Sequence, residues 1–177
     1  SFSSPNAYRY TGDRGDAKRK ELFRKLNQPG QGGHGSNKDF ITQTAGNANA
    51  SSDEIRRMAS GYKPKAGYPS TSLGRNLQTI AALVVRGLST RIYFTELGGF
   101  DTHSNQRLGH DRLMLQLDEA VTAFYKDLKA QGHDQRVLTM TTSEFGRRVK
   151  ENGSRGTDHG AASALFMFGP AVKPGIH

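Results

Sequence analysis

Hydrophobic residues recur at helical spacing in two long stretches of the chain. The first begins after a candidate N-cap at Thr71 or Ser72, and the second covers about residues 107–130 and ends at Gly132. Their apolar positions are Leu73, Leu77, Ile80, Ala81, Val84 and Leu88, then Met114, Leu117, Val121, Phe124 and Leu128. A repeat of three or four residues places these side chains on one face of each helix. The pattern predicts two helices, each buried along one side.

Three shorter apolar runs predict β-strands. Residues 91–95 are rich in β-branched and aromatic side chains and are followed by Gly98-Gly99, residues 136–142 form the second run, and residues 165–168 form the third. A strand-helix-strand crossover keeps the first two strands parallel, so the loops that follow them should meet at one edge of a sheet. If the loop before the third strand joins them, that strand must run in the opposite direction. We predict an α/β fold with a mostly parallel sheet flanked by helices and a late antiparallel strand.

The first 70 residues differ from this pattern, since they are polar, loop-rich and only weakly periodic. We predict a short helix over residues 16–26 and two helical pieces between residues 39 and 60, with Asp53 capping the second piece. His34 lies in a glycine-rich loop between these helices and is expected to be a bystander. The predicted organisation is a helical N-terminal segment, 1–70, and an α/β core, 71–177.

The composition limits the possible chemistry of the chain more than it limits the possible binding partners. The chain has 177 residues, no cysteine and a formal net charge of +9. The absence of cysteine excludes thiolate metal sites and cysteine nucleophiles, and the positive charge favours anionic partners. No apolar run reaches the length of a membrane span. Because the chain starts without Met and ends after a turn, we expect it to be a piece of a longer precursor.

Acidic and histidine side chains lie next to each of the predicted strands. Asp101 and His103 follow the first, Glu144 follows the second, and Asp158 and His159 precede the third. Carboxylate oxygens and imidazole nitrogens from separate loops are the ligands that a catalytic divalent ion requires. Each residue also has an ordinary explanation, such as helix capping by Asp101 or a turn at Asp158. Their coincidence at one expected sheet edge predicts a metal site formed by all five.

A basic loop and several hydroxyls accompany these ligands. The guanidinium of Arg147 is predicted to bind an oxyanion, because Arg147 lies three residues from Glu144. The alternative interpretations are a solvated basic loop or ion pairing with Glu144 and Glu151. The hydroxyls of Thr102, Ser143 and Thr157 are candidate nucleophiles, and nothing in the sequence marks one of them as activated by a base.

The same motifs resemble a known family. Gly98-Gly99-Phe100-Asp101-Thr102-His103, Ser143-Glu144-Phe145-Gly146-Arg147 and Thr157-Asp158-His159-Gly160 are similar to the C-terminal half of a bacterial domain-of-unknown-function family, number fifteen-oh-one. The resemblance is strong over about residues 73–176 and weak before them. It implies a partial alkaline-phosphatase-like three-layer fold, related to the sulfatases, and export to the periplasm or cell surface. Phe145 stands where that superfamily has a second metal ligand, and the early strand that bears its nucleophile has no counterpart here.

Two functions follow as hypotheses. The first is a metal-dependent hydrolase of phosphate or sulfate esters, using zinc, calcium or manganese and acting on an anionic small molecule or glycan ester. The second is a non-catalytic exported protein that binds anions or serves as a scaffold. Specific nucleic-acid binding ranks last, because no helix-turn-helix, zinc-finger or aromatic β-platform pattern accompanies the charge.

Overall fold

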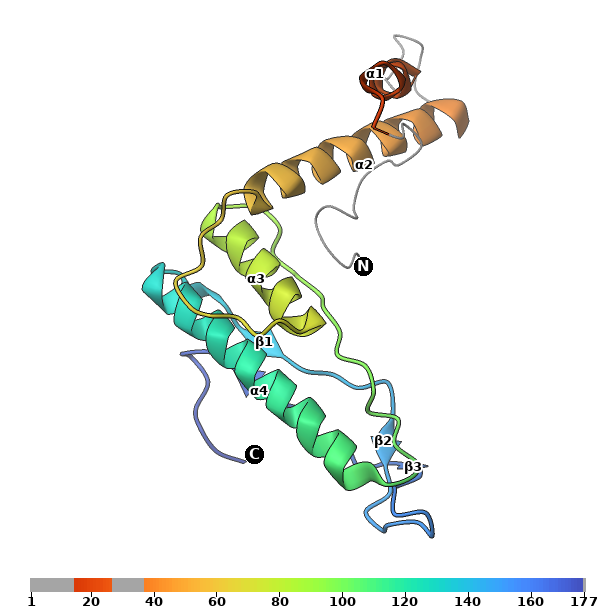
Figure 1. Ribbon diagram of the computed structural model, residues 1–177, viewed down its shortest axis with the longest axis vertical. Helices are drawn as coiled ribbons and strands as arrows, with labels where there is room; N and C mark the ends of the chain where they lie inside the picture. The colour runs from red at the N-terminus through yellow and green to blue at the C-terminus, as the bar shows by residue number, and fades with distance from the viewer. Residues whose placement is uncertain (1–14, 27–36, 177) are drawn as a thin grey trace. The chain divides into compact units, whose positions relative to one another are not determined.

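The computed structural model describes residues 15–26 and 37–176. These contain α1 (Ala17–Leu26), α2 (Asn37–Ala59), α3 (Ser72–Val85), α4 (Gln106–Ala130), a 3-10 turn η1 (Asp134–Arg136), and the strands β1 (Thr139–Met140), β2 (Gly146–Arg147), β3 (His159–Gly160) and β4 (Met167–Phe168) (Figure 1). The chain divides into two compact units, one ending at Tyr62 and the other beginning at Lys63. Among the described residues, no helix is both long and apolar enough to cross a membrane. His34 lies outside them.

The N-terminal unit consists of α1 and α2. The helix predicted over residues 16–26 is confirmed as α1, but the two helical pieces predicted after it form one continuous helix, α2. Asp53 lies inside α2 rather than at a cap. It pairs with Arg24 of α1 and with Arg56 one turn further along α2. The predicted polar link, residues 44–52, is helical, and the residue predicted as a cap makes an ion pair with the neighbouring helix instead.

The core of the second unit lies between α3 and α4. Its buried apolar residues are Leu73, Leu77, Ala81, Ala82, Leu83 and Val84 on α3, and Ala120, Val121, Ala123, Phe124 and Leu128 on α4. The Thr71 hydroxyl accepts a hydrogen bond from the Gly74 amide at 3.1 Å, which confirms Thr71 as the N-cap of α3. Only the second half of α4 is buried, so its first half extends beyond the core toward the loops that carry the predicted ligands.

The predicted parallel α/β sheet is wrong. The described residues contain two sheets of two short antiparallel strands each, β1 with β4 and β2 with β3, and no parallel pair. Residues 91–95 have strand-forming side chains but are not part of a strand, because strand propensity forms a ladder only where a neighbouring strand accepts its hydrogen bonds. The alkaline-phosphatase-like three-layer fold is therefore not observed. The antiparallel direction of the last strand is confirmed, since Thr139 pairs with Phe168 and Met140 with Met167.

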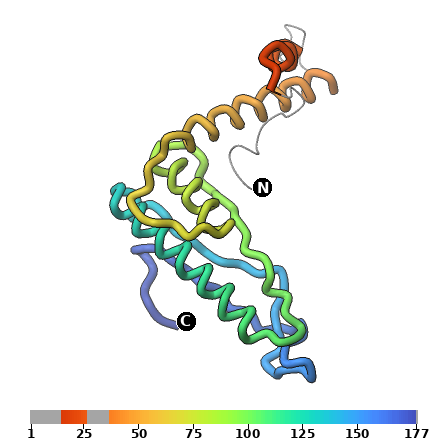
Figure 2. Tube along the Cα trace, in the orientation of Figure 1, coloured from red at the N-terminus to blue at the C-terminus, as the bar shows by residue number. Residues whose placement is uncertain are grey.

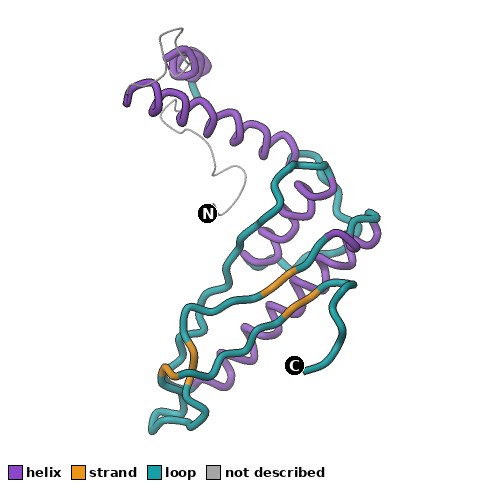
Figure 3. The backbone as a smooth tube through the Cα atoms, turned by 180° about the vertical axis from the view of Figure 1, so that it is seen from behind, coloured by secondary structure: helices purple, strands orange, loops and turns teal. Residues whose placement is uncertain are grey.

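The extended segments nevertheless form a layer beside the helices. In Figure 1 α3 and α4 lie in front, and in Figure 3, seen from behind, the extended segments lie in front of α4. The Tyr125 hydroxyl of α4 ties β1 and β4 to the helix by hydrogen bonds to Thr139 Oγ1 at 2.9 Å and to the Phe168 carbonyl at 2.7 Å. Exposure alternates along the layer, so Tyr93 and Thr95 are half-buried while Ile92 and Phe94 are 86% and 74% exposed. We call the exposed side, with Ile92, Phe94, Leu138 and Met140, the outer apolar face.

The course of the chain explains how distant loops meet. The connection from α3 to α4 and the connection from α4 to β2 run in the same direction, and both reach the end of the unit where α4 begins (Figure 2). Residues 91–95 and 136–142 therefore run in the same direction, as predicted for two segments joined by a helix, although no parallel ladder forms between them. As a result, the loop around Asp101 and the loop between β2 and β3 share one end of the second unit.

Candidate metal centre

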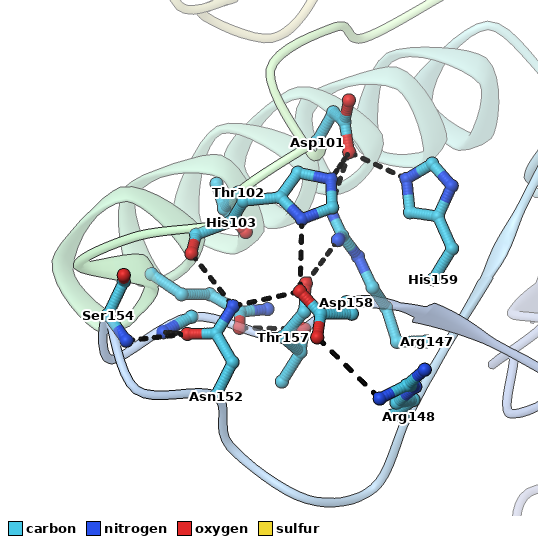
Figure 4. A network of polar contacts seen from close by, with 12 residues as sticks. Asp101, Thr102, His103, Arg147, Arg148, Asn152, Ser154, Thr157, Asp158 and His159 are labelled. Carbon is cyan, nitrogen blue, oxygen red and sulfur yellow. Dashed lines mark hydrogen bonds and ion pairs between the residues drawn. The ribbon is translucent and has the colours of Figure 1, made fainter.

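One carboxylate oxygen is the centre of the polar network at this end. Oδ1 of Asp101 lies 2.8 Å from Nε2 of His159, 3.0 Å from Nε2 of His103 and 3.0 Å from Nη2 of Arg147 (Figure 4). His159 is 58 residues from Asp101 along the chain. The hydrogen bond from His159 lowers the pKa of Asp101; loss of hydration opposes this effect, and the charges of His103, His159 and Arg147 add to it. Asp101 is therefore held as an anion among three nitrogen groups.

Three of the five predicted ligands come together. The ligand atoms of Asp101, His103 and His159 all lie within 4.8 Å of one another, and all three side chains are exposed. Asp158 and Glu144 are not part of this group. Asp158 lies on the far side of His103, with its Oδ1 3.4 Å from Nδ1, and Glu144 is an exposed residue before β2. The structure thus separates the predicted set into an inner group of three and two outer residues.

Arg147 contacts three protein groups from two segments. Its guanidinium donates to the Phe100 carbonyl at 2.7 Å, to the Asp101 carboxylate and to the Thr157 carbonyl. The side chain is only 16% exposed. These bonds hold the Asp101 loop against the segment before β3, so Arg147 acts as a link between loops. Oxyanion binding by Arg147 stays a prediction, and the neighbouring Arg148, 67% exposed, has the more accessible guanidinium.

Phe145 supports the group from one side. Its ring stacks on the His159 imidazole, with centroids 4.5 Å apart and planes 10° apart. The Arg147 guanidinium carbon lies 4.8 Å from the centre of the same ring. Pairing of Arg147 with His159 across β2 and β3 places these groups side by side. Phe145, at the position where the resemblance implies a second metal ligand, therefore orients the candidate ligand His159 instead.

Asn152 is the residue that sequence reasoning missed. Its amide nitrogen donates to the His103 carbonyl and to Asp158 Oδ1, each at 3.0 Å. Its side-chain oxygen accepts from the Ser154 and Gly156 amides at 2.9 and 3.0 Å. The dipeptide Asn152-Gly153 is a turn signal, and an asparagine in such a turn bonds to the backbone two residues on. That signal predicts the turn but neither the contact to His103 in the other loop nor the contact to Asp158.

The two loops are also joined through their backbones. The Asn105 amide donates to the Ser154 carbonyl at 3.0 Å, and the Gln106 amide donates to the Arg155 carbonyl at 2.9 Å. Asn105 and Arg155 have positive φ values of 44° and 60°. Left-handed backbone is unfavourable for residues other than glycine and is held only where surrounding contacts enforce it. The loops around Asp101 and Asn152 therefore form one preorganised unit.

Comparison with known proteins identifies the family at this point. The family described as "Protein of unknown function (DUF1501)" matches residues 10–177. The chain belongs to this family. The match includes all five predicted ligands and extends well before Leu73, into the part of the chain where the resemblance is weak. It carries no link to the alkaline phosphatase and sulfatase superfamily. No curated protein and no solved structure matches the chain.

Proposed function

We propose that this protein binds a divalent metal ion through Asp101, His103 and His159 and acts on phosphate or sulfate esters at that ion. The observation that carries the proposal is the gathering of three ligand atoms within 4.8 Å from loops far apart in the sequence. Among zinc, calcium and manganese, the donor set favours zinc and then manganese. Calcium prefers oxygen ligands, whereas two of the three donors here are imidazole nitrogens.

The spacing of the donor atoms suits such an ion. Zinc binds nitrogen and oxygen at about 2.0–2.1 Å, so two donors on a tetrahedral ion lie about 3.4 Å apart. The contacts from Asp101 to the two histidines, 2.8 and 3.0 Å, need only small side-chain movements to reach this separation. Three protein ligands leave a fourth position for water or substrate, which is the pattern of catalytic rather than structural zinc sites.

The surrounding charges favour an anionic substrate. Arg148 is exposed beside the group, with its Nη1 3.7 Å from Asp158 Oδ2, and the exposed residues Lys150 and Arg155 lie in the same loop. A bound ion would supply Lewis-acid polarisation of an ester oxygen and a lower pKa for bound water. The protein groups would hold the substrate: Arg148 would contact the non-bridging oxygens, and Arg147 would keep Asp101 in place.

A non-catalytic anion-binding protein is the second candidate, favoured by the hydroxyl groups. Those of Thr102, Ser143 and Thr157 donate to oxygen acceptors, namely the Phe100 carbonyl, the Phe145 carbonyl and Gln106 Oε1. None of these acceptors is a general base, so none of the three hydroxyls has the partner that activates a nucleophile. Under this alternative the ion and Arg148 would retain an anionic ligand without turnover.

Metal titration of the chelator-treated protein tests the proposal. We expect the wild type to bind one zinc ion, Asp101→Ala and His159→Ala to lose binding, and Asp111→Ala, an exposed acid on α4, to bind like the wild type. Absence of binding in the wild type, or unchanged binding in both ligand variants, would refute it.

Turnover separates the two candidates. Hydrolysis of aryl phosphate or aryl sulfate esters by the zinc-loaded wild type, lost in Asp101→Ala, supports the enzyme. If zinc binds but neither ester is cleaved, and inorganic phosphate binding depends on Arg148, the non-catalytic function is the correct one. Arg57, an exposed arginine of α2, provides the matched control as Arg57→Ala.

A further inference from the structure

Both ring nitrogens of His103 face carboxylates. Nε2 lies 3.0 Å from Asp101 Oδ1, and Nδ1 lies 3.4 Å from Asp158 Oδ1. Figure 4 shows the imidazole between the two acids. A histidine binds a metal through one nitrogen, and the hydrogen bond made by the other nitrogen decides which of them keeps the proton. The carboxylate at Nδ1 therefore influences whether Nε2 has a free lone pair.

Asp158 is itself held in place. Its Oδ1 accepts a hydrogen bond from Asn152 Nδ2 at 3.0 Å, and its Oδ2 faces Arg148. Asn152 bonds in turn to the His103 carbonyl and to the Ser154 and Gly156 amides. The Asp158 carboxylate is thus oriented toward Nδ1 by a side chain that is anchored to the backbone of both loops.

From this geometry we infer that Asp158 and Asn152 are positioning residues that set the tautomer of His103. Asp158 keeps the proton on Nδ1 of His103. The lone pair on Nε2 is then free to bind the metal together with the ligand atoms of Asp101 and His159, while Asn152 holds Asp158 in place. The inference rests on the metal site proposed above, and it gives Asp158 a different role from the ligand role predicted from sequence. The arrangement corresponds to the carboxylate-histidine-metal triads in which outer carboxylates fix ligand orientation.

The backbone makes this orientation independent of a metal. Bonds from the Asn105 and Gln106 amides to the Ser154 and Arg155 carbonyls join the loops directly. Gly156 is buried against the His103 backbone, where a Cβ would lie 2.2 Å from the His103 carbonyl carbon. Protein contacts alone therefore hold Asp158 beside His103, and the tautomer can be measured in metal-free protein.

Nitrogen-15 NMR of the imidazoles provides that measurement. In wild type both His103 nitrogens face acceptors, so the metal-free test uses Asp101→Ala, which leaves Asp158 as the acidic partner of His103. At about pH 9, well above the ordinary histidine pKa of about 6.5, we expect His103 to carry its proton on Nδ1. The double variant Asp101→Ala with Asp158→Ala should shift the proton to Nε2, the tautomer that free imidazole side chains favour. Retained amide signals for Ser154 and Gly156 would show that the loops are intact, and the same tautomer in both variants would overturn the inference.

Zinc affinity gives an independent readout. An amide at position 158 can donate a hydrogen bond to Nδ1, which favours the tautomer with the proton on Nε2. Asp158→Asn should therefore weaken zinc binding by about 10–100-fold, the range seen when outer partners of ligands are changed. Glu151→Gln removes a charge from an exposed acid in the same loop and should leave affinity unchanged. Equal losses in both variants would indicate a general charge effect and overturn the assignment. If the wild type binds no zinc, the proposed function fails, and the tautomer measurement alone decides the role of Asp158.

Discussion

The Tyr68 hydroxyl donates a hydrogen bond at 2.9 Å to Oδ2 of Asp127, a carboxylate that is fully buried on α4. The other oxygen of Asp127 accepts from the Lys65 amide at 2.7 Å. Asp127 therefore ties the segment that precedes α3 to the centre of the helical core. Buried charged groups are stable only where hydrogen bonds replace their lost hydration, and these two bonds contribute to that replacement.

Removing this carboxylate should destabilise the second unit. In Asp127→Ala the Lys65 amide and the Tyr68 hydroxyl lose this acceptor, at a cost of about 0.5–1.5 kcal/mol for each hydrogen bond. Tyr68→Phe removes one bond and should cost about 0.5–1.5 kcal/mol. Urea unfolding measures both, with Asp111→Ala on the exposed side of the same helix as the control. A stability equal to that of the wild type in Asp127→Ala would contradict the prediction.

Gly156 should tolerate no side chain. A Cβ at this position would lie 2.2–2.5 Å from backbone atoms of His103 and Ser104, and backbone cannot rotate away as a side chain can. We expect Gly156→Ala to cost about 1–3 kcal/mol, as other overpacked sites do, and to speed hydrogen exchange at the Asn105 and Gln106 amides.

Gly153 lies in the same loop and supplies the control. Nothing lies within 4 Å of a Cβ placed there. Gly153→Ala should therefore stay within about 0.5 kcal/mol of the wild type, as is usual at open surface positions. Equal effects of the two substitutions would show that the loops do not pack as described.

The helix pair of the N-terminal unit should weaken in acid. Burial raises the pKa of Asp53, but the hydrogen bond and charge of Arg24, with the charges of Lys20 and Arg56, outweigh it and lower the pKa below its ordinary value of 3.8. A carboxyl with a lowered pKa stabilises the fold above its ordinary pKa, and this contribution disappears as the pH falls through the lowered value. Because the pair is partly exposed, we expect about 0.2–1 kcal/mol. Circular dichroism of the full chain between pH 7 and pH 3 should show a smaller acid-induced loss of helix in Asp53→Asn, with Glu54→Gln as the neighbouring control.

The outer apolar face should bind a hydrophobic dye. Ile92, Phe94, Leu138 and Met140 are 86%, 74%, 58% and 59% exposed, and exposed apolar surface of this kind is where a hydrophobic dye binds. Ile92→Thr with Phe94→Thr should reduce fluorescence of anilinonaphthalene sulfonate while changing stability by less than about 0.5 kcal/mol per site. Leu77→Ala in the core should instead lower the stability by about 2–5 kcal/mol without reducing the dye fluorescence. Unchanged dye binding in the double variant would place the exposed apolar surface elsewhere.

Local patterns predicted the helices well and the strands poorly. The repeat of Leu73, Leu77, Ala81 and Val84 places apolar groups on one face, so α3 and its buried side follow from neighbours three and four residues apart. The break predicted within α2 is wrong, since residues 44–52 are helical, and Asp53, predicted as a cap, pairs instead with Arg24, 29 residues away. The strand predicted at residues 91–95 is wrong because its side chains favour extended backbone, whereas a hydrogen-bonded ladder also requires a neighbouring strand.

By itself, the sequence determined the helical periods, a helix cap at Thr71 or Ser72, the direction of the last strand and the candidate ligand types. Only the tertiary structure decided that Asp101, His103 and His159 form the inner group while Asp158 and Glu144 stay outside it. It also decided that Phe145 and Asn152 support this group. Helix formation depends on residues within one or two turns, whereas the geometry of a site depends on side chains that loops bring together across more than fifty residues.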